Sequence, residues 1–293
     1  MRLPIRRPAA GGRRTARVQR RSSFISLTRL LAAVGLAAVS GAFYWASVGR
    51  EFVVDPAAVT IEGATYTDVA QVRADLGLGA DDGSAASSTV RNIFRVRTDA
   101  IQQRIQALPA VLSASVTASL PNRLAVVIHE RVPIFAWSAG DASWLVDRTG
   151  VLLAQVSLPS DTAAAALPRI VDLRTGAPPA ELGGQLAPLD LEAARLLGAV
   201  TPADLGSAAT ELDVSVEDTD GWIISVPHGW RAVFGQFSPD LHKTDEIPRQ
   251  VQCLASLLAS REGSIGTVTL SVAPDRCGTF TDASPAPSAK PSR

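Results

Sequence analysis

The sequence predicts an α+β protein with a single N-terminal transmembrane helix, a β-α-α-β-β domain, and a second mixed domain built on an antiparallel sheet with helices. Three observations predict this class. An uncharged run of 19 residues occupies positions 30–48. Apolar residues recur at helical spacing in two segments before residue 110, and they alternate with polar residues in two runs after it. Beyond residue 132, short alternating runs are separated by turns and helical stretches.

The uncharged run, Leu30–Val48, reads LLAAVGLAAVSGAFYWASV. As a helix it is ~28 Å long, close to the thickness of the hydrocarbon core of a bilayer. Tyr44 and Trp45 lie near its end, where aromatic rings favour the headgroup layer. Arg29 can extend its charge toward water, so we expect the helix over residues 24–48.

The charge pattern predicts the orientation of this helix. Nine arginines and no acidic residue precede Leu30, and such a flank stays cytoplasmic. We expect a disordered tail at 1–23, a linker at 49–57, and everything after it outside the cytoplasm. The alternative is a cleaved signal peptide, whose apolar core would be shorter and would precede an A-x-A site. A basic tail can also bind nucleic acid or anionic lipid, but its role as a topology signal is enough to explain the nine arginines.

Residues 58–131 are predicted to form one compact domain. Period-two alternation over 112–120 and 124–128, with a turn at Pro121-Asn122, predicts an antiparallel hairpin. The other predicted elements are a strand at 59–62 and helices at 67–76 and 98–108, with a loop over 77–88 between the helices.

The hairpin carries an ordered set of residues that reads "LP-x-V", then "P-x-x-L", then "ER-x-P". The set consists of Leu108, Pro109, Val111, Ala114, Val116, Pro121, Leu124, Glu130, Arg131 and Pro133. This set resembles the POTRA signature of the FtsQ/DivIB family of bacterial cell-division proteins. Later residues are similar to further family patterns, and the resemblance covers residues 24–275. These matches are Trp137, Leu145, Val146, Asp147 and Gly150, then Leu167, Pro168, Arg169 and Ile170, then Gly229, Val233, Gly235 and Lys243.

Residues 132–275 are therefore expected to form an FtsQ-type β domain, with a disordered tail at 276–293. Within this domain we expect a helix that starts at Ser238-Pro239 and is kinked at Pro248, followed by a final strand.

The resemblance implies a non-enzymatic bitopic scaffold of the division machinery that recruits and links membrane proteins for septum formation. The implied partners are small bitopic proteins of the FtsL/FtsB (DivIC) type and other division proteins. The implied location is the inner (cytoplasmic) membrane at the septum. The alternative is a POTRA-bearing component of polypeptide transport or outer-membrane assembly. That class usually adds a transmembrane barrel, and runs of ~10-residue amphipathic strands are missing here.

The residue patterns typical of catalysis are missing. Neither G-x-S-x-G nor S-x-x-K occurs, which counts against a membrane-anchored enzyme. His129, His228 and His242 are scattered, and two cysteines without a suitably spaced histidine do not predict a zinc site. We expect no metal, cofactor, small-molecule substrate or nucleic acid.

The expected final strand suggests a docking site. Its residues are Thr267, Val268, Thr269, Leu270, Ser271 and Val272. A terminal strand often lies at a sheet edge, where its free main-chain groups can pair with a partner's strand. The alternative is that the tail or another strand covers this edge. The family often carries a "DLR" triplet in this strand, which is absent here. The triplet Asp172-Leu173-Arg174 occurs mid-chain and is interpreted as coincidence.

Cys253 and Cys277 are the two cysteines, and both fall after the predicted anchor, where a disulfide is permitted. A bridge requires Cα atoms within ~7 Å, so the sequence leaves open whether the two are bonded.

Overall fold

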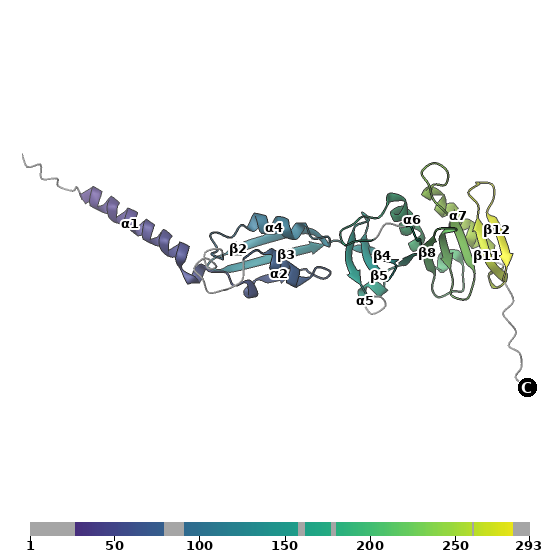
Figure 1. Ribbon diagram of the computed structural model, residues 1–293, viewed down its shortest axis with the longest axis horizontal. Helices are drawn as coiled ribbons and strands as arrows, with labels where there is room; N and C mark the ends of the chain where they lie inside the picture. Colours follow the sequence, from purple (N-terminus) through teal and green to yellow (C-terminus); the bar gives the residue numbers. More distant parts are fainter. Residues whose placement is uncertain (1–26, 79–90, 158–161, 177–179, 260, 284–293) are drawn as a thin grey trace, which may run out of the picture. The chain divides into compact units, whose positions relative to one another are not determined.

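The computed structural model describes residues 27–78, 91–157, 162–176, 180–259 and 261–283 (Figure 1). The chain divides into two compact units, residues 1–49 and 50–293. The tail expected at 1–23 lies outside the described residues, as does most of the loop expected at 77–88.

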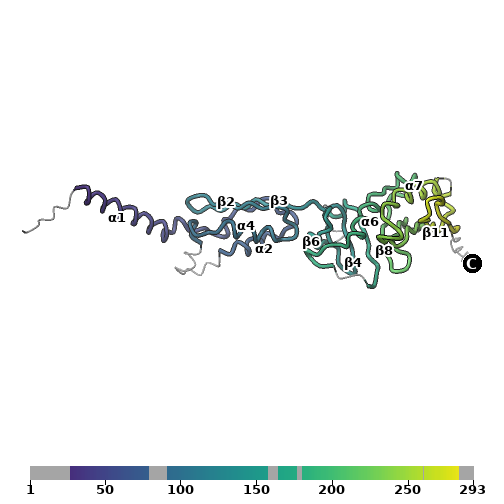
Figure 2. Tube along the Cα trace, turned by 90° about the horizontal axis from the view of Figure 1, so that it is seen from above, coloured from purple at the N-terminus to yellow at the C-terminus, as the bar shows by residue number. Residues whose placement is uncertain are grey.

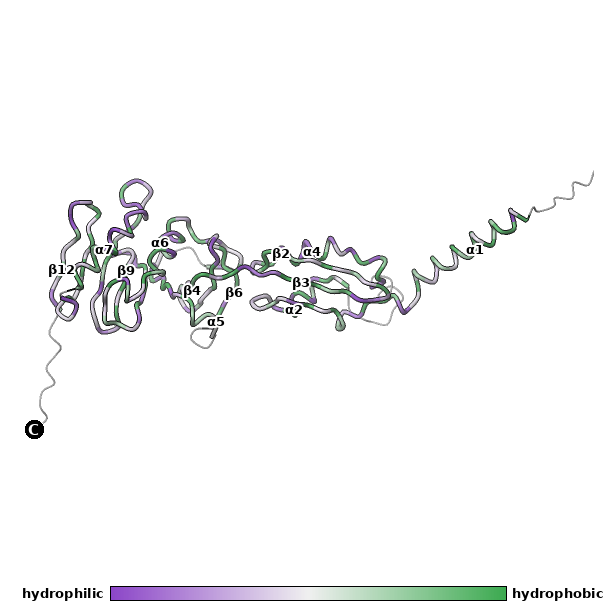
Figure 3. Tube along the Cα trace, turned by 180° about the vertical axis from the view of Figure 1, so that it is seen from behind, coloured by the Kyte–Doolittle hydropathy of each residue, from purple (hydrophilic) through white to green (hydrophobic). Residues whose placement is uncertain are grey.

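Helix α1, Leu27–Val48, is the described part of the first unit. Its 22 residues span about 33 Å, and none of them is buried. Apolar residues follow one another along its length (Figure 3). The helix is long and apolar enough to cross a membrane, by length and composition. The single N-terminal apolar helix of the predicted fold is confirmed.

The first domain of the second unit, residues 50–131, has the predicted β-α-α-β-β order. Its sheet has the order β1-β3-β2, with β1 parallel and β2 antiparallel to β3. Apolar residues of both helices, including Val72, Ile101 and Ile105, pack against Val126 and Ile128 of the sheet. The elements are η1 Arg50–Phe52, η2 Pro56–Ala58, β1 Thr60–Glu62, α2 Val69–Asp75, α4 Thr98–Gln106, β2 Val111–Ser119 and β3 Arg123–Glu130.

The second domain, residues 132–283, is built on a nine-stranded sheet of order β12-β11-β10-β9-β8-β7-β4-β5-β6. Its elements are β4 Pro133–Ala139, β5 Ala142–Asp147, β6 Leu152–Val156, α5 Thr162–Ala165, β7 Arg169–Asp172, α6 Pro188–Gly198, η3 Ala203–Leu205, β8 Asp213–Glu217, β9 Gly221–Ser225, β10 Arg231–Gly235, η4 Thr244–Glu246, α7 Ile247–Leu258, η5 Glu262–Ser264, β11 Ile265–Leu270 and β12 Gly278–Asp282.

The α+β class is confirmed, but the sheet is mixed rather than purely antiparallel. Three neighbouring pairs are parallel: β4 with β7, β7 with β8, and β10 with β11. Parallel neighbours need a crossover connection. Helix α6 lies between β7 and β8 in the chain, and α7 lies between β10 and β11.

One row of side chains crosses this sheet from strand to strand. The register pairs Trp137 with Ile170, and the row continues through Val214, Ile224, Ala232 and Val268. All six are at most 4% exposed. They share a core with residues of α6 and α7, such as Leu197 and Leu254. The alternation seen in the sequence thus becomes one buried face.

The "ER" motif at the end of β3 bonds within the first domain through Glu130 and to the second domain through Arg131. The Glu130 carboxylate accepts hydrogen bonds from the backbone N–H groups of residues 65–67, at 2.7–3.0 Å. The next residue, Arg131, donates from Nη1 to Asp147 Oδ2 of the second domain at 2.9 Å. Residues of both domains also share a small apolar cluster. Its buried members are Ala110, Leu145, Leu153 and Ala164.

Asp147 at this junction gives a pH-dependent prediction. Burial alone would raise the pKa of Asp147, but hydrogen bonds from Thr149, Val151 and Arg131 outweigh it, so this pKa lies below its usual 3.8. A carboxyl with a lowered folded-state pKa stabilises the fold above the unfolded value, and this contribution is lost as pH falls through the folded value. We expect Asp147→Asn to unfold more easily at pH 7 and to flatten the loss of stability below about pH 4. Urea titrations across pH check this, and a variant with wild-type acid dependence would contradict it.

Candidate functional site

Strand β11 is not the edge of the sheet, contrary to the prediction for Thr267–Val272. It lies between β10 and β12, so partners flank it on both sides. The strand ends at Leu270, and Ser271 donates its N–H to the Cys277 carbonyl at 3.0 Å. The prediction was wrong because the chain turns back after residue 273 and adds β12, within the part expected to be a disordered tail. The alternative that another strand covers this edge is the correct one.

Strand β12 therefore forms an open edge of the nine-stranded sheet. The described residues place no further strand beside it. At the opposite edge, β6 is partly covered, because Leu152 exchanges two main-chain hydrogen bonds with Gly183 and Gly184, both at 2.9 Å. Strand β12 reads GTFTD and contains neither lysine nor proline, the residues that commonly block pairing at an edge.

The main-chain groups of β12 alternate between the sheet and the open side. The hydrogen bond between Ser271 and Cys277 fixes this alternation, since the ladder of an antiparallel pair repeats every two residues. Residues 279 and 281 then direct their N–H and C=O groups toward β11, and Phe280 directs its own outward. The Phe280 side chain pairs in register with Val268, is 37% exposed, and has the Arg261 guanidinium carbon 5.3 Å from its ring centroid.

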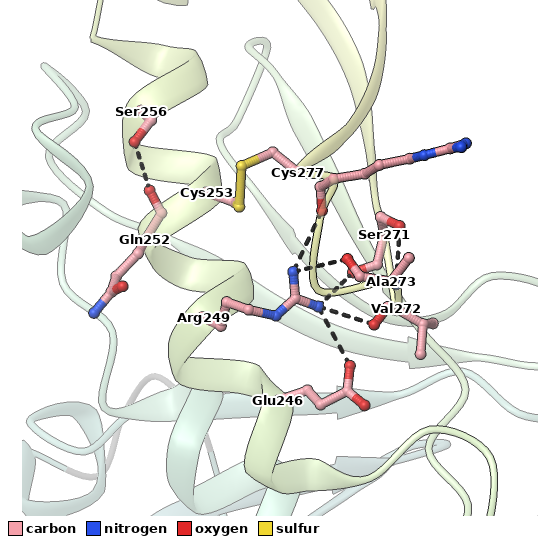
Figure 4. Close-up of a disulfide and its surroundings, with 10 residues drawn as sticks. Glu246, Arg249, Gln252, Cys253, Ser256, Ser271, Val272, Ala273 and Cys277 are labelled. Carbon is pink, nitrogen blue, oxygen red and sulfur yellow. Dashed lines mark hydrogen bonds and ion pairs between the residues drawn. A yellow bond between two sulfur atoms is a disulfide. The ribbon is translucent and has the colours of Figure 1, made fainter.

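A disulfide attaches this edge to helix α7. The structure bonds Cys253, on α7, to Cys277, in the turn before β12, with 5.1 Å between the two Cα atoms (Figure 4). Cys277 is exposed and Cys253 is half-buried. The bond joins the start of β12 to a helix whose other face lies in the core through Leu254 and Leu258.

Arg249 makes a second attachment from the same helix. Its guanidinium donates to the carbonyl oxygens of Ser271, Val272, Ala273 and Arg276 at 3.0–3.3 Å, and it pairs with Glu246 at 3.3 Å. Figure 4 shows Arg249 between the helix and the turn. Hydrogen bonds from a charged donor are stronger than neutral ones. Together with the disulfide, they hold the β11–β12 turn against α7.

The three histidines do not come together in the structure. His242 is buried, with Nδ1 3.1 Å from the Gln236 carbonyl oxygen and Nε2 3.2 Å from Gln250 Nε2. His129 and His228 are exposed in the first and second domains respectively. In the part of the chain that the structure describes, no group of three or more His, Cys, Asp or Glu side chains is arranged to hold a metal ion.

The mid-chain triplet Asp172-Leu173-Arg174 has an internal structural role. Arg174 Nη2 lies 2.9 Å from Asp172 Oδ2 and 3.0 Å from Asp190 Oδ2. These contacts tie the end of β7 to the first turn of α6. The triplet is not at the edge of the sheet, and it stabilises the interior of the second domain.

A β-α-α-β-β domain followed by a sheet domain places this chain among POTRA-bearing proteins. Residues 55–131 match the model of the FtsQ-type POTRA domain. The chain is similar to proteins named cell division protein FtsQ from Chloroflexus aurantiacus (29% identity, over 52% of this chain and 50% of that protein) and Chloroflexus aggregans (30%, over 51% and 50%). FtsQ of Mycobacteroides abscessus is 39% identical over 20% of this chain and 19% of that protein. These similarities support the predicted resemblance to the FtsQ/DivIB family. The matches span at most half the length of these relatives.

Proposed function

We propose that this protein is a non-catalytic, single-pass membrane scaffold of bacterial cell division that recruits and links membrane partners for septum formation. The FtsQ-type POTRA domain and the names of the similar proteins support a role in division. Helix α1 supports a membrane anchor. Small bitopic proteins of the FtsL/FtsB type are the proposed partners, and the septum is the proposed location.

We propose further that a partner docks at β12, as an extended segment added to the open edge of the sheet. The observation that carries this proposal is the edge itself, which is unpaired in the described chain and held in place by Cys253–Cys277 and Arg249. A fixed edge loses little conformational freedom when a strand is added, so its main-chain groups bind more tightly. The proposed docking site is therefore residues 278–282 rather than residues 267–272.

Replacing Phe280 tests this edge. Phe280→Pro and Phe280→Ala both remove the ring, but only proline removes the outward N–H. We expect Phe280→Pro to capture its division partners about tenfold less well than Phe280→Ala, because one main-chain hydrogen bond is lost and one partner group is left unpaired. Affinity co-purification with quantification of the bound partners measures this. Equal capture by two folded variants would show that partners do not pair with β12.

The orientation of the anchor is tested with a reporter enzyme that works only outside the cytoplasm. Nine arginines precede Leu30, so we expect alkaline phosphatase to be active when fused at Arg293 and inactive when fused at Arg21. Phosphatase activity at Arg21 and none at Arg293 would reverse the topology.

A further inference from the structure

One end of the first domain combines exposed apolar side chains with arginines that have no ion pair to any described residue. Strands β1 and β3 both begin at this end, and β2 and β3 are joined there by the turn at 120–122. Helix α4 also begins there, because it packs against β2 and the chain reverses between the two. Figures 1 and 2 show the same end from two directions. Its exposed residues, named here the basal patch, are Arg50, Phe94, Arg95, Arg97, Leu120 and Arg123.

The chain itself keeps part of this patch close to the end of α1. Phe52 follows Val48 by four positions, so it lies within about 14 Å of the helix end by chain length alone. Phe52 accepts a hydrogen bond from Ile93 N–H at 2.8 Å, and Val54 donates to the Arg91 carbonyl at 2.9 Å. The ring centroids of Phe52 and Phe94 are 5.2 Å apart. The segment at 91–95 is therefore fixed to the residues that directly follow the apolar helix.

The apolar members of the patch are strongly exposed. Phe94 is 56% exposed and Leu120 is 64% exposed. The Phe94 backbone N–H donates to Asn92 Oδ1 at 3.0 Å, which fixes the turn that presents the ring. Within the described chain, neither side chain belongs to an apolar core. Phenylalanine and leucine are among the apolar side chains that insert at the boundary between headgroups and acyl chains.

The arginines of the patch carry charges that no described carboxylate neutralises. Among the described residues, none of its four guanidinium groups has an ion pair or a side-chain hydrogen bond. Elsewhere Arg131, Arg174, Arg231 and Arg249 all pair with carboxylates. Glu51, Asp55 and Asp99 are exposed at the same end, so the four arginines outnumber these three carboxylates by one. Free guanidinium groups bind phosphate oxygens well, with two parallel hydrogen bonds.

We propose that the basal patch rests on the bilayer that holds α1, with Phe94 and Leu120 among the headgroups and the arginines on the phosphates of anionic phospholipids. The inference rests on the proposed role of α1 as a membrane anchor. Arginine beside aromatic and apolar residues is the composition of interfacial membrane-binding surfaces. This contact orients the first domain on the membrane and so restricts the orientations that the second domain can adopt.

Photo-crosslinking of the full chain in vesicles tests the proposal. Benzoylphenylalanine replaces Phe94, Leu120 or, as the matched control, Leu241, which is 85% exposed in the second domain. Vesicles of phosphatidylcholine are compared with vesicles that also contain phosphatidylglycerol, and adducts are identified by mass. We expect lipid adducts from positions 94 and 120 and none from position 241. Lipid adducts that are equally abundant at all three positions, or adducts to a second copy of the chain, would overturn the proposal.

Charge variants make the test sharper. Each arginine near an anionic surface contributes about fivefold to binding. In vesicles that contain phosphatidylglycerol, we expect R95Q and R97Q each to lower the yield of lipid adducts at position 94 by about that factor. In vesicles of phosphatidylcholine alone, we expect little change in that yield. Arg148→Gln, at an exposed arginine of the second domain without an ion pair, is the control and should change nothing. Lipid adducts at 94 that are unaffected by R95Q and R97Q would overturn the role of the arginines.

Flotation of the vesicles separates this inference from the proposed function. A chain that floats with vesicles but forms no lipid adduct at position 94 would overturn the basal patch and leave the anchor intact. A chain that does not float would overturn both.

Discussion

Replacing Arg174 with methionine is expected to lower the free energy of unfolding by about 3 kcal/mol. Arg174 lies between Asp172 and Asp190, 2.9 and 3.0 Å from their nearest oxygens, and the Asp172 side chain is only 4% exposed. Methionine retains the apolar stem of the side chain but leaves the Asp172 carboxylate buried without a counter-charge. Breaking one partner of a buried pair is costly for that reason. Urea unfolding followed by far-UV circular dichroism measures the loss.

Arg195→Met is the matched control for this measurement. Arg195 also pairs with a carboxylate, that of Glu192 at 2.7 Å, but both side chains are about half exposed. Water replaces such a partner at little cost, so we expect no measurable change in stability. If Arg174→Met and Arg195→Met had the same effect, burial would not be what makes the Arg174 cluster important.

The sequence correctly predicted the strands whose apolar and polar side chains alternate. The alternation over residues 112–120 and 124–128 became β2 and β3, in antiparallel register from Ser119–Arg123 to Val111–Glu130. Alternation specifies which face is buried, so a strand pair with a short turn has almost no other arrangement. The motifs also predicted the FtsQ-type POTRA domain, whose model matches residues 55–131. The pairing of Arg131 with Asp147 links two of those motifs in space, and spacing along the chain contains no signal for it.

The errors arose where local signals were ambiguous. Proline is compatible both with the first turn of a helix and with a kink inside one. We expected a helix from Ser238-Pro239 with a kink at Pro248. The structure begins α7 at Ile247, with Pro248 in the first turn, while Ser238 and His242 close a separate turn. The role of Arg174 was missed because it depends on the end of β7 meeting α6.

The open edge was misplaced for a similar reason. Strand β12 has five residues, of which Phe280 is the only large apolar one, and a proline-rich tail follows it. Such a segment does not stand out by alternation. Its pairing depends on contacts made by β11 and on the covalent bond at Cys277. Whether a short segment forms a strand depends more on its tertiary contacts than on its own composition.

Replacing both cysteines, Cys253→Ser with Cys277→Ser, is expected to lower the free energy of unfolding by about 3 kcal/mol. The two residues are 24 positions apart, and a bond that closes a loop of this size removes many conformations from the unfolded chain. The folded domain should persist, because Arg249 still holds the turn before β12 through four carbonyl oxygens.

The same double variant tests whether the disulfide supports docking at β12. Without the disulfide, the turn at residues 271–277 is held to α7 by the hydrogen bonds of Arg249 rather than by a covalent bond. An edge that must first be ordered binds an incoming strand less well, so we expect partner capture to fall several-fold, by about 1 kcal/mol. Treating the wild type with a reductant should reproduce both losses, and the same reductant should leave the double variant unchanged. Wild-type stability together with wild-type capture in the double variant would show that the edge is positioned without the Cys253–Cys277 bond.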